Sequence, residues 1–252
     1  MIHFFDSHAH LTAPEVLTHL DGILARAKKA GVDRMINICT CRTTLEEGLK
    51  LKGMLNAGAT TPHDVEKDGE ADFGVFERAA REGKIIAIGE TGLDYHYQHS
   101  DRKVQKKFLI RYLHLAAELN LPVIFHCREA FEDLFEIVDQ EYPKRAPAIL
   151  HCFTGTEAEA EGVLERGWHL SLSGIVTFKK STALQEVAKF VPLEQLLIET
   201  DTPYLAPQSK RGRQNEPAFV VETAACIAML RGETLELIAK HTRENGIRLF
   251  SL

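Results

Sequence analysis

The chain has 252 residues, of which 44% are hydrophobic and 26% charged, and a formal net charge of −6. The length fits one α/β barrel of about 250 residues, and the composition is that of an ordinary globular protein rather than a disordered one. The negative charge argues against a protein that coats nucleic acid by bulk electrostatics, but not against an enzyme that grips a few phosphates. No apolar run approaches the roughly 20 residues needed to span a bilayer, and no export signal is evident, so we expect no membrane contact.

Cysteine usage indicates the compartment. The five cysteines are few and odd in number, which makes a disulfide framework improbable and predicts a cytoplasmic protein. The pair Cys39 and Cys41 has no second pair at the spacing of a zinc finger, so we do not assign it to a metal.

Short apolar runs alternate with longer amphipathic segments, a pattern typical of βαβ units and a parallel sheet. Before the second run, Pro14 starts a helix whose inward stripe is Leu17, Leu20, Leu24 and Ala27, and Gly31 ends it. The runs predict eight strands, at residues 3–5, 34–39, 54–59, 85–89, 123–126, 148–151, 169–173 and 196–198.

Further helices follow from periodicity and caps. Residues 101–120 predict a helix with its N-cap at Ser100 or Asp101, ending before Pro122, and residues 216–230 and 234–250 predict two closing helices. An open doubly wound sheet would carry a glycine-rich phosphate turn after an early strand, and the sequence has none. We therefore predict an α/β fold of the TIM (β/α)8 barrel type, with residues 1–252 forming a single domain.

Histidine and acidic residues fall where the predicted strands end. The first run leads into His8 and His10, the fourth into Glu90, the fifth and sixth into His126 and His151, and the eighth into Glu199 and Asp201. In a parallel barrel all such ends share one face, where active sites are built. Each residue taken alone has a plain structural interpretation, as a polar rim, a helix cap or a hydrogen-bonded core histidine. Six such groups buried together without a cation would cost several kcal/mol apiece, to an order of magnitude, unless each were paired.

Four imidazoles and two carboxylates are too many for one open tetrahedral site but suffice for two adjacent cations that share a carboxylate. We assign His8, His10, Glu90 and Asp201 to one cation, and Glu90, His126 and His151 to the other, with Glu90 as the bridge. Nitrogen and oxygen ligands without thiolate suit Zn²⁺ or Mn²⁺ and, with this much imidazole, Mg²⁺ less well.

Six segments of the chain resemble, in order, the signatures of TatD-type deoxyribonucleases. They are Asp6-Ser7-His8-Ala9-His10-Leu11, Gly89-Glu90-Thr91-Gly92-Leu93-Asp94-Tyr95, Phe125-His126-Cys127-Arg128, His151-Cys152-Phe153-Thr154-Gly155, Glu199-Thr200-Asp201-Thr202-Pro203-Tyr204-Leu205 and Arg211-Gly212-Arg213-Gln214-Asn215-Glu216-Pro217. The resemblance implies an amidohydrolase-like TIM barrel, cytoplasmic, with metal-dependent nuclease activity, often exonucleolytic on single-stranded DNA. It also implies the same ligand set.

One segment departs from the family pattern. Where relatives usually read Gly-x-His-Pro-His, this chain has Ala59-Thr60-Thr61-Pro62-His63, so Thr61 replaces the first histidine. The resemblance places that residue near substrate rather than among the metal ligands, which puts substrate preference in question more than catalysis. His63 is retained, and it is either a phosphate contact or a solvent-exposed loop histidine.

Two arginines are the other candidates for substrate binding. Arg128 follows His126 by two residues, and Arg213 lies in the cationic segment after the last strand, ahead of a helix N-terminus that itself attracts anions. A solvated charged loop is the alternative for the segment around Arg213.

The hypothesis for function is hydrolysis of DNA phosphodiesters, as a 3′–5′ exonuclease on single-stranded ends, by a monomer with two divalent metal ions. The cations would activate a water molecule and polarise the phosphoryl oxygen, with Asp201 and Glu90 catalytic and Glu199 the rival of Asp201 as proton acceptor. The same site would also serve an ester or amide hydrolase, such as a D-aminoacyl-tRNA deacylase. A non-catalytic scaffold on a barrel frame is a third reading, and the full ligand complement speaks against it.

Overall fold

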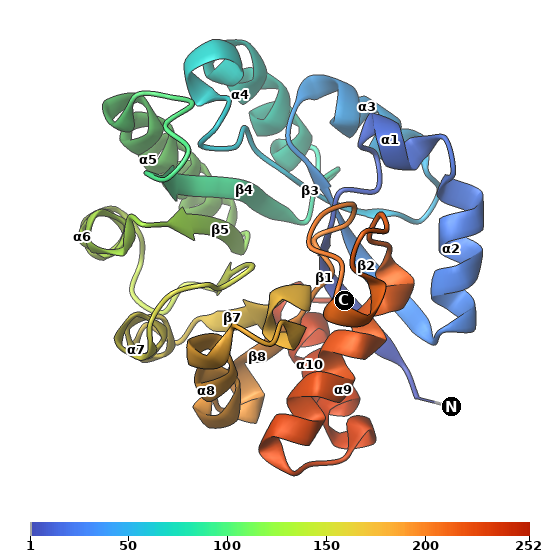
Figure 1. Cartoon of the computed structure of the whole chain (residues 1–252). Helices are drawn as coiled ribbons and strands as arrows, with labels where there is room; N and C mark the ends of the chain where they lie inside the picture. The colour runs from blue at the N-terminus through green and yellow to red at the C-terminus, as the bar shows by residue number, and fades with distance from the viewer. Residues whose placement is uncertain (1) are drawn as a thin grey trace.

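The computed structural model describes residues 2–252, and its centre is one sheet of eight parallel strands in sequential order, from β1 to β8. In Figure 1 the helices form a ring outside the strands. The strands are β1 (Phe4–Ala9), β2 (Val32–Cys39), β3 (Leu55–Gly58), β4 (Ala87–Asp94), β5 (Val123–Arg128), β6 (Ala148–Leu150), β7 (His169–Leu172) and β8 (Leu196–Ile198). The helices are α1 (Pro14–Leu17), α2 (Leu20–Lys29), α3 (Arg42–Lys50), α4 (Val65–Arg81), α5 (Arg102–Leu119), α6 (Phe131–Glu141), α7 (Glu157–Glu165), α8 (Thr182–Phe190), α9 (Val220–Arg231) and α10 (Leu235–Leu249), with short 3-10 turns η1 (Gly174–Thr177), η2 (Leu193–Gln195), η3 (Gln208–Lys210) and η4 (Pro217–Phe219).

The ring of strands closes between the first strand and the segment after the last. The Asp201 backbone N–H donates to the carbonyl oxygen of His8 over 2.9 Å. The carboxylate of Asp6, which is fully buried, accepts the hydroxyl of Thr200 at 2.6 Å and its backbone N–H at 2.9 Å. These bonds hold the two ends of the chain's sheet together and confirm the predicted TIM barrel.

Two separate layers of apolar side chains stabilise the barrel. Inward residues from seven strands, such as Phe5, Ile36 and Ile124, fill the interior, and Phe250 from the C-terminus stacks on Phe5 with ring centroids 6.0 Å apart. A larger cluster lies between the strands and the helices. Because side chains alternate along a strand, most of the strands supply both layers. Burial of this apolar area is the main stabilising contribution to the fold.

The predicted elements are all present, but their boundaries differ. Four strands extend beyond the sequence prediction at one end or both, and β4 runs from Ala87 to Asp94 instead of stopping at Gly89. The prediction ended strands where polar residues began, whereas here polar residues such as Glu90 are buried inside the strand. The helix predicted after Pro14 is two helices, α1 and α2, interrupted at Thr18 and His19.

The buried stripe of that first helical region was also wrong in part, since Val16, Leu20, Ile23 and Ala27 are buried while Leu17 and Leu24 are only partly so. The buried positions keep helical spacing across the break, but at two places the buried residue is the one before the predicted leucine. By contrast, α5 begins after an N-cap at Asp101, whose side chain accepts the Lys103 N–H, and ends at Asn120 in the left-handed region. Within residues 2–252, none of the helices combines the length and the apolarity that crossing a membrane requires.

Candidate metal centre

The six residues predicted as metal ligands come together at the carboxyl ends of the strands. They come from five strand ends: β1 supplies His8 and, just past its end, His10, while the others are Glu90, His126, His151 and Asp201. All six side chains are buried or nearly so, although they are separated by up to 193 positions in sequence. The barrel topology, rather than local sequence, creates this cluster.

The first group of donor atoms consists of His8 Nε2, His10 Nε2, Glu90 Oε2 and Asp201 Oδ1. The two ring nitrogens are 3.3 Å apart, and Asp201 Oδ1 lies 3.7 Å from His8 Nε2 and 3.3 Å from His10 Nε2. Glu90 Oε2 is 3.5 Å from His8 Nε2 and 3.7 Å from His10 Nε2. Each of the two ring nitrogens is therefore close to both carboxylate oxygens, and His8, His10 and Asp201 form a group that could hold a metal ion.

The second group uses the other oxygen of the same glutamate. Glu90 Oε1 lies 2.8 Å from His126 Nδ1 and 3.1 Å from His151 Nε2, and these two nitrogens are 3.4 Å apart. The two oxygens of Glu90 thus face two different groups of donor atoms, Oε2 the first and Oε1 the second. This orientation could not be read from the sequence.

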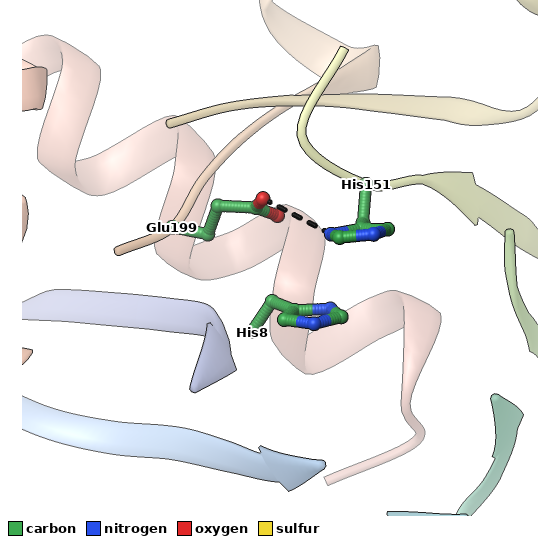
Figure 2. A group of neighbouring side chains, drawn as sticks. All are labelled: His8, His151 and Glu199. Carbon is green, nitrogen blue, oxygen red and sulfur yellow. Dashed lines mark hydrogen bonds and ion pairs between the residues drawn. The ribbon is translucent and has the colours of Figure 1, made fainter. Parts of the chain in front are cut away.

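The fully buried carboxylate of Glu199 contacts one of the predicted ligands, His151. Glu199 Oε1 lies 3.3 Å from His151 Nδ1, on the side of the ring away from Glu90. The rings of His8 and His151 are nearly parallel, with centroids 3.8 Å apart. Figure 2 shows the Glu199 carboxylate reaching toward His151. One ring nitrogen of each histidine and one Glu199 oxygen all lie within 4.8 Å of one another. A carboxylate in this place fixes the tautomer and the orientation of a metal-binding imidazole.

Asp94 is placed beside His126 as Glu199 is beside His151, and it is a site residue that was not predicted from the sequence. Its Oδ2 lies 2.9 Å from His126 Nε2 and 3.0 Å from His63 Nε2, while Oδ1 accepts the backbone N–H groups of His96 and Tyr97. With Nε2 hydrogen-bonded to Asp94, His126 presents Nδ1 to Glu90. Its place in the sequence could have predicted this role, because Asp94 ends the Gly-Glu-Thr-Gly-Leu-Asp segment and lies on the same strand as Glu90.

Gly92 permits the close pairing of β4 and β5 at this point. It pairs with His126, its φ is +150°, and a Cβ there would lie 1.9 Å from the His126 carbonyl oxygen. No other residue fits without moving His126. The need for a glycine at position 92 thus follows from the position of His126, a candidate ligand.

Burial and the facing charges shift the pKa values of the cluster. Burial, together with the neighbouring His151, lowers the pKa of His8 to about 3, so this imidazole is neutral and has a free lone pair. Burial raises the pKa of Glu90, but His151 and the hydrogen bonds from His126 and His151 outweigh it, so the pKa lies well below its ordinary value and Glu90 stays ionised. Burial lowers the pKa of His151, yet the charges of Glu90 and Glu199 bring it well above its ordinary range. In place of a proton, His151 Nε2 can hold a metal ion.

The spacing of the donor atoms fits a metal ion. Zinc binds nitrogen and carboxylate oxygen at about 2.0–2.2 Å, so neighbouring donors of a tetrahedral site lie roughly 3.3–3.6 Å apart. The five measured separations in the first group span 3.3 to 3.7 Å. His8 Nδ1 and Glu199 Oε2 are buried without a hydrogen-bond partner within the protein. The donor set therefore fits hard or borderline divalent cations, and no thiolate is part of it.

A cavity of about 1200 Å³ opens above the cluster. It is lined by two of the predicted substrate-binding residues, His63 and Arg128, but Arg213 is not among its lining residues. The segment after Arg213 leads only into η4, a 3-10 turn of three residues, before α9 begins. Thr61 lines the cavity and is largely buried, and its hydroxyl donates to Asp64 Oδ2 over 3.0 Å.

Known proteins resemble this chain in both sequence and fold. The family model described as TatD related DNase matches residues 5–251. The metal-dependent hydrolase YabD of Bacillus subtilis is 38% identical over 252 residues, covering 98% of this chain and 99% of the relative. The 3′-5′ ssDNA/RNA exonuclease TatD of Erwinia tasmaniensis is 36% identical over 259 residues, covering 98% of this chain and 100% of the relative.

Among solved structures, YJJV, a TatD homologue from Escherichia coli, superposes with a TM-score of 0.92 at 27% identity, covering 99% of this chain and 98% of that one. A dihydroorotase from Campylobacter jejuni, at 12% identity and a TM-score of 0.61, shares the fold alone. Because the family model and the relatives match nearly the whole chain, the protein belongs to the TatD family of metal-dependent hydrolases.

Proposed function

We propose that the protein is a two-metal phosphodiesterase that removes nucleotides from the 3′ ends of single-stranded DNA. The observation that carries the two-metal part is the orientation of Glu90, whose two carboxylate oxygens face two different groups of donor atoms. The substrate class is supported by relatives named 3′-5′ ssDNA/RNA exonuclease, at 36% and 33% identity. Since every donor comes from one chain, we expect the monomer to be active.

Six residues of the chain would bind the metal ions, and one of them would also orient the attacking water. His8, His10, Glu90 and Asp201 would hold one cation, and Glu90, His126 and His151 the other. When bound, such cations acidify a water molecule and polarise a phosphoryl oxygen. The carboxylate of Asp201 lines the cavity, where it would orient the attacking water and accept one of its protons.

Substrate would be held from the side of β3 and β5. Arg128 lines the cavity and takes part in none of the ion pairs found within residues 2–252. One of its N–H groups donates to the Tyr97 hydroxyl, and the others would bind a phosphate. His63 lines the same wall and is held by Asp94. Hydrolysis adds water across the P–O3′ bond and releases a nucleoside 5′-monophosphate.

The test is a metal-by-substrate panel on purified protein. Zn²⁺, Mn²⁺ and Mg²⁺ would each be added to chelator-treated protein and assayed on single-stranded DNA labelled at the 5′ or the 3′ end, on RNA, and on a D-aminoacyl-tRNA. The proposal expects a ladder of 5′-labelled products shortening from the 3′ end, lost in chelator. Turnover of the D-aminoacyl-tRNA alone would instead favour the deacylase.

Two variants separate the roles of the neighbouring carboxylates. Asp201→Ala should abolish turnover, whereas Glu199→Ala should weaken metal retention first and lose turnover only at low metal concentration. An Asp201→Ala protein with full activity and full metal content would refute the assignment.

A further inference from the structure

Large apolar side chains left in contact with water reveal a second feature of the cavity. Within residues 2–252, four are exposed: Leu49, Tyr97, Tyr204 and Met229. Both aromatic ones, Tyr97 at 50% exposure and Tyr204 at 52%, line the cavity above the metal centre. The other two do not line it.

The two tyrosines stand on opposite sides of the cluster. Tyr97 lies in the loop after β4, and Tyr204 in the loop after β8. In a closed ring of eight strands in sequential order, β4 and β8 are four places apart, which is diametrically across the barrel. The printed contacts link each ring to a different group of predicted ligands. Tyr204 contacts His10 of the first group, and Tyr97 contacts His63, whose ring centroid lies 5.3 Å from that of His126 in the second group.

Each ring is held in place by a residue of the site. Arg128 lies over the ring of Tyr97, 4.7 Å from its centroid, and its guanidinium donates to the Tyr97 hydroxyl over 3.1 Å. His99 lies nearly parallel to the same ring, with centroids 5.7 Å apart. Tyr204 meets His10 edge to face at 5.9 Å. Rings that are fixed yet half exposed are suited to stacking against a planar ligand.

We propose that Tyr97 and Tyr204 are two nucleobase platforms, one for each nucleoside joined by the phosphodiester that is cut. This inference rests on the proposed function and names where its substrate binds. A scissile phosphate at the metal centre has one base on either side, and the barrel offers one aromatic ring on either side. Stacking on aromatic rings tolerates any base, as an exonuclease requires. Beside Tyr97, the free donors of Arg128 would take the phosphate of the same nucleotide.

The experiment measures binding without turnover. Metal-free protein would be titrated into single-stranded oligonucleotides carrying 2-aminopurine at the terminal or the penultimate 3′ position, because stacking on an aromatic ring quenches its fluorescence. Variants would be Tyr97→Ala, Tyr204→Ala and the two matching Phe changes. Met229→Ala, which removes an exposed apolar side chain from α9 outside the cavity, is the matched control.

Each Ala variant should raise the Kd by about fivefold to 150-fold, while each Phe variant stays within about threefold of wild type. An abasic unit removes the base that one tyrosine would stack on. On an oligonucleotide with an abasic unit at the terminal 3′ position, one of the two Ala variants should therefore bind like wild type. With the abasic unit at the penultimate position, the other Ala variant should bind like wild type. Initial-rate kinetics on metal-loaded protein should show the same losses in KM more than in kcat.

The outcomes separate this inference from the proposed function. If wild type cleaves single-stranded DNA and the Ala variants behave like Met229→Ala, the platforms are refuted and the nuclease stands. Ala losses that persist with abasic units at both positions also refute base stacking. Tyrosine-dependent quenching in a protein that cleaves no nucleic acid keeps the platforms and overturns the nuclease. A wild type that neither binds nor cleaves overturns both.

Discussion

Replacing the buried carboxylate behind the candidate ligands tests the metal assignment most sharply. Glu199→Gln keeps the volume and one acceptor for His151 Nδ1, which lies 3.3 Å away, but removes the negative charge. A hydrogen bond to a charged group contributes about 1.5–3 kcal/mol and a neutral one about 1 kcal/mol. Loss of such a partner typically weakens metal binding 10- to 100-fold, which corresponds to about 1.4–2.8 kcal/mol. We therefore expect the metal dissociation constant to rise at least about tenfold.

The stability of the metal-free protein should change in the opposite direction. Glu199 is fully buried, and its Oε2 has no hydrogen-bond partner within the protein, so without a cation the carboxylate is a cost. Metal-free Glu199→Gln should then melt at the same temperature as wild type or higher, and the metal-loaded variant lower. Calorimetric titration of Zn²⁺ and melting curves with and without metal measure both. The control is Glu186→Gln on the exposed face of α8. Unchanged metal affinity in Glu199→Gln would refute the reasoning.

Three further predictions concern stability and substrate binding. Burial and the nearby charge of Arg248 lower the pKa of His169 to about 4, below the 6.5 of an unfolded chain. The contribution of the neutral His169 to the free energy of unfolding is therefore complete above pH 6.5 and falls by up to about 3 kcal/mol as the pH drops toward 4. In urea titrations the free energy of unfolding of His169→Gln should depend less steeply on pH, and an equal slope would contradict this. Arg128→Ala should reduce the slope of log K against log salt for oligonucleotide binding by the amount expected for about one phosphate contact. Arg213 does not line the cavity, so Arg213→Ala should reduce this slope less. The reverse order would make Arg213 the main phosphate contact. Gly92→Ala should lower the free energy of unfolding by about 3 kcal/mol or more, since the new Cβ would lie 1.9 Å from a carbonyl oxygen on β5. Gly74→Ala on α4, which has open space around it, should be neutral or slightly stabilising. Equal free energies of unfolding for the two variants in urea denaturation would refute the steric account.

The sequence supported the fold more firmly than the element boundaries. Eight apolar runs in alternation with helical segments were enough to predict a closed parallel barrel, because that pattern has few other solutions. Boundaries failed where polar residues are buried inside strands, as in β4, since hydrophobicity alone cannot distinguish a buried carboxylate from a loop residue. The interruption at Thr18 and His19 was likewise invisible, because helical periodicity continues across it.

The identities of the candidate ligands were likewise readable from the chain, because parallel strands in a barrel send their carboxyl ends to one face, and His or acidic residues at those ends must then meet. Which atom of each residue faces which neighbour was decided only by the tertiary structure. Glu90 divides its oxygens between two groups, His126 turns Nδ1 toward Glu90 because Asp94 holds Nε2, and Tyr97 and Tyr204 line the same cavity. These are relations between side chains of different strands, set by strand stagger and side-chain packing, and a linear pattern of residues does not contain them.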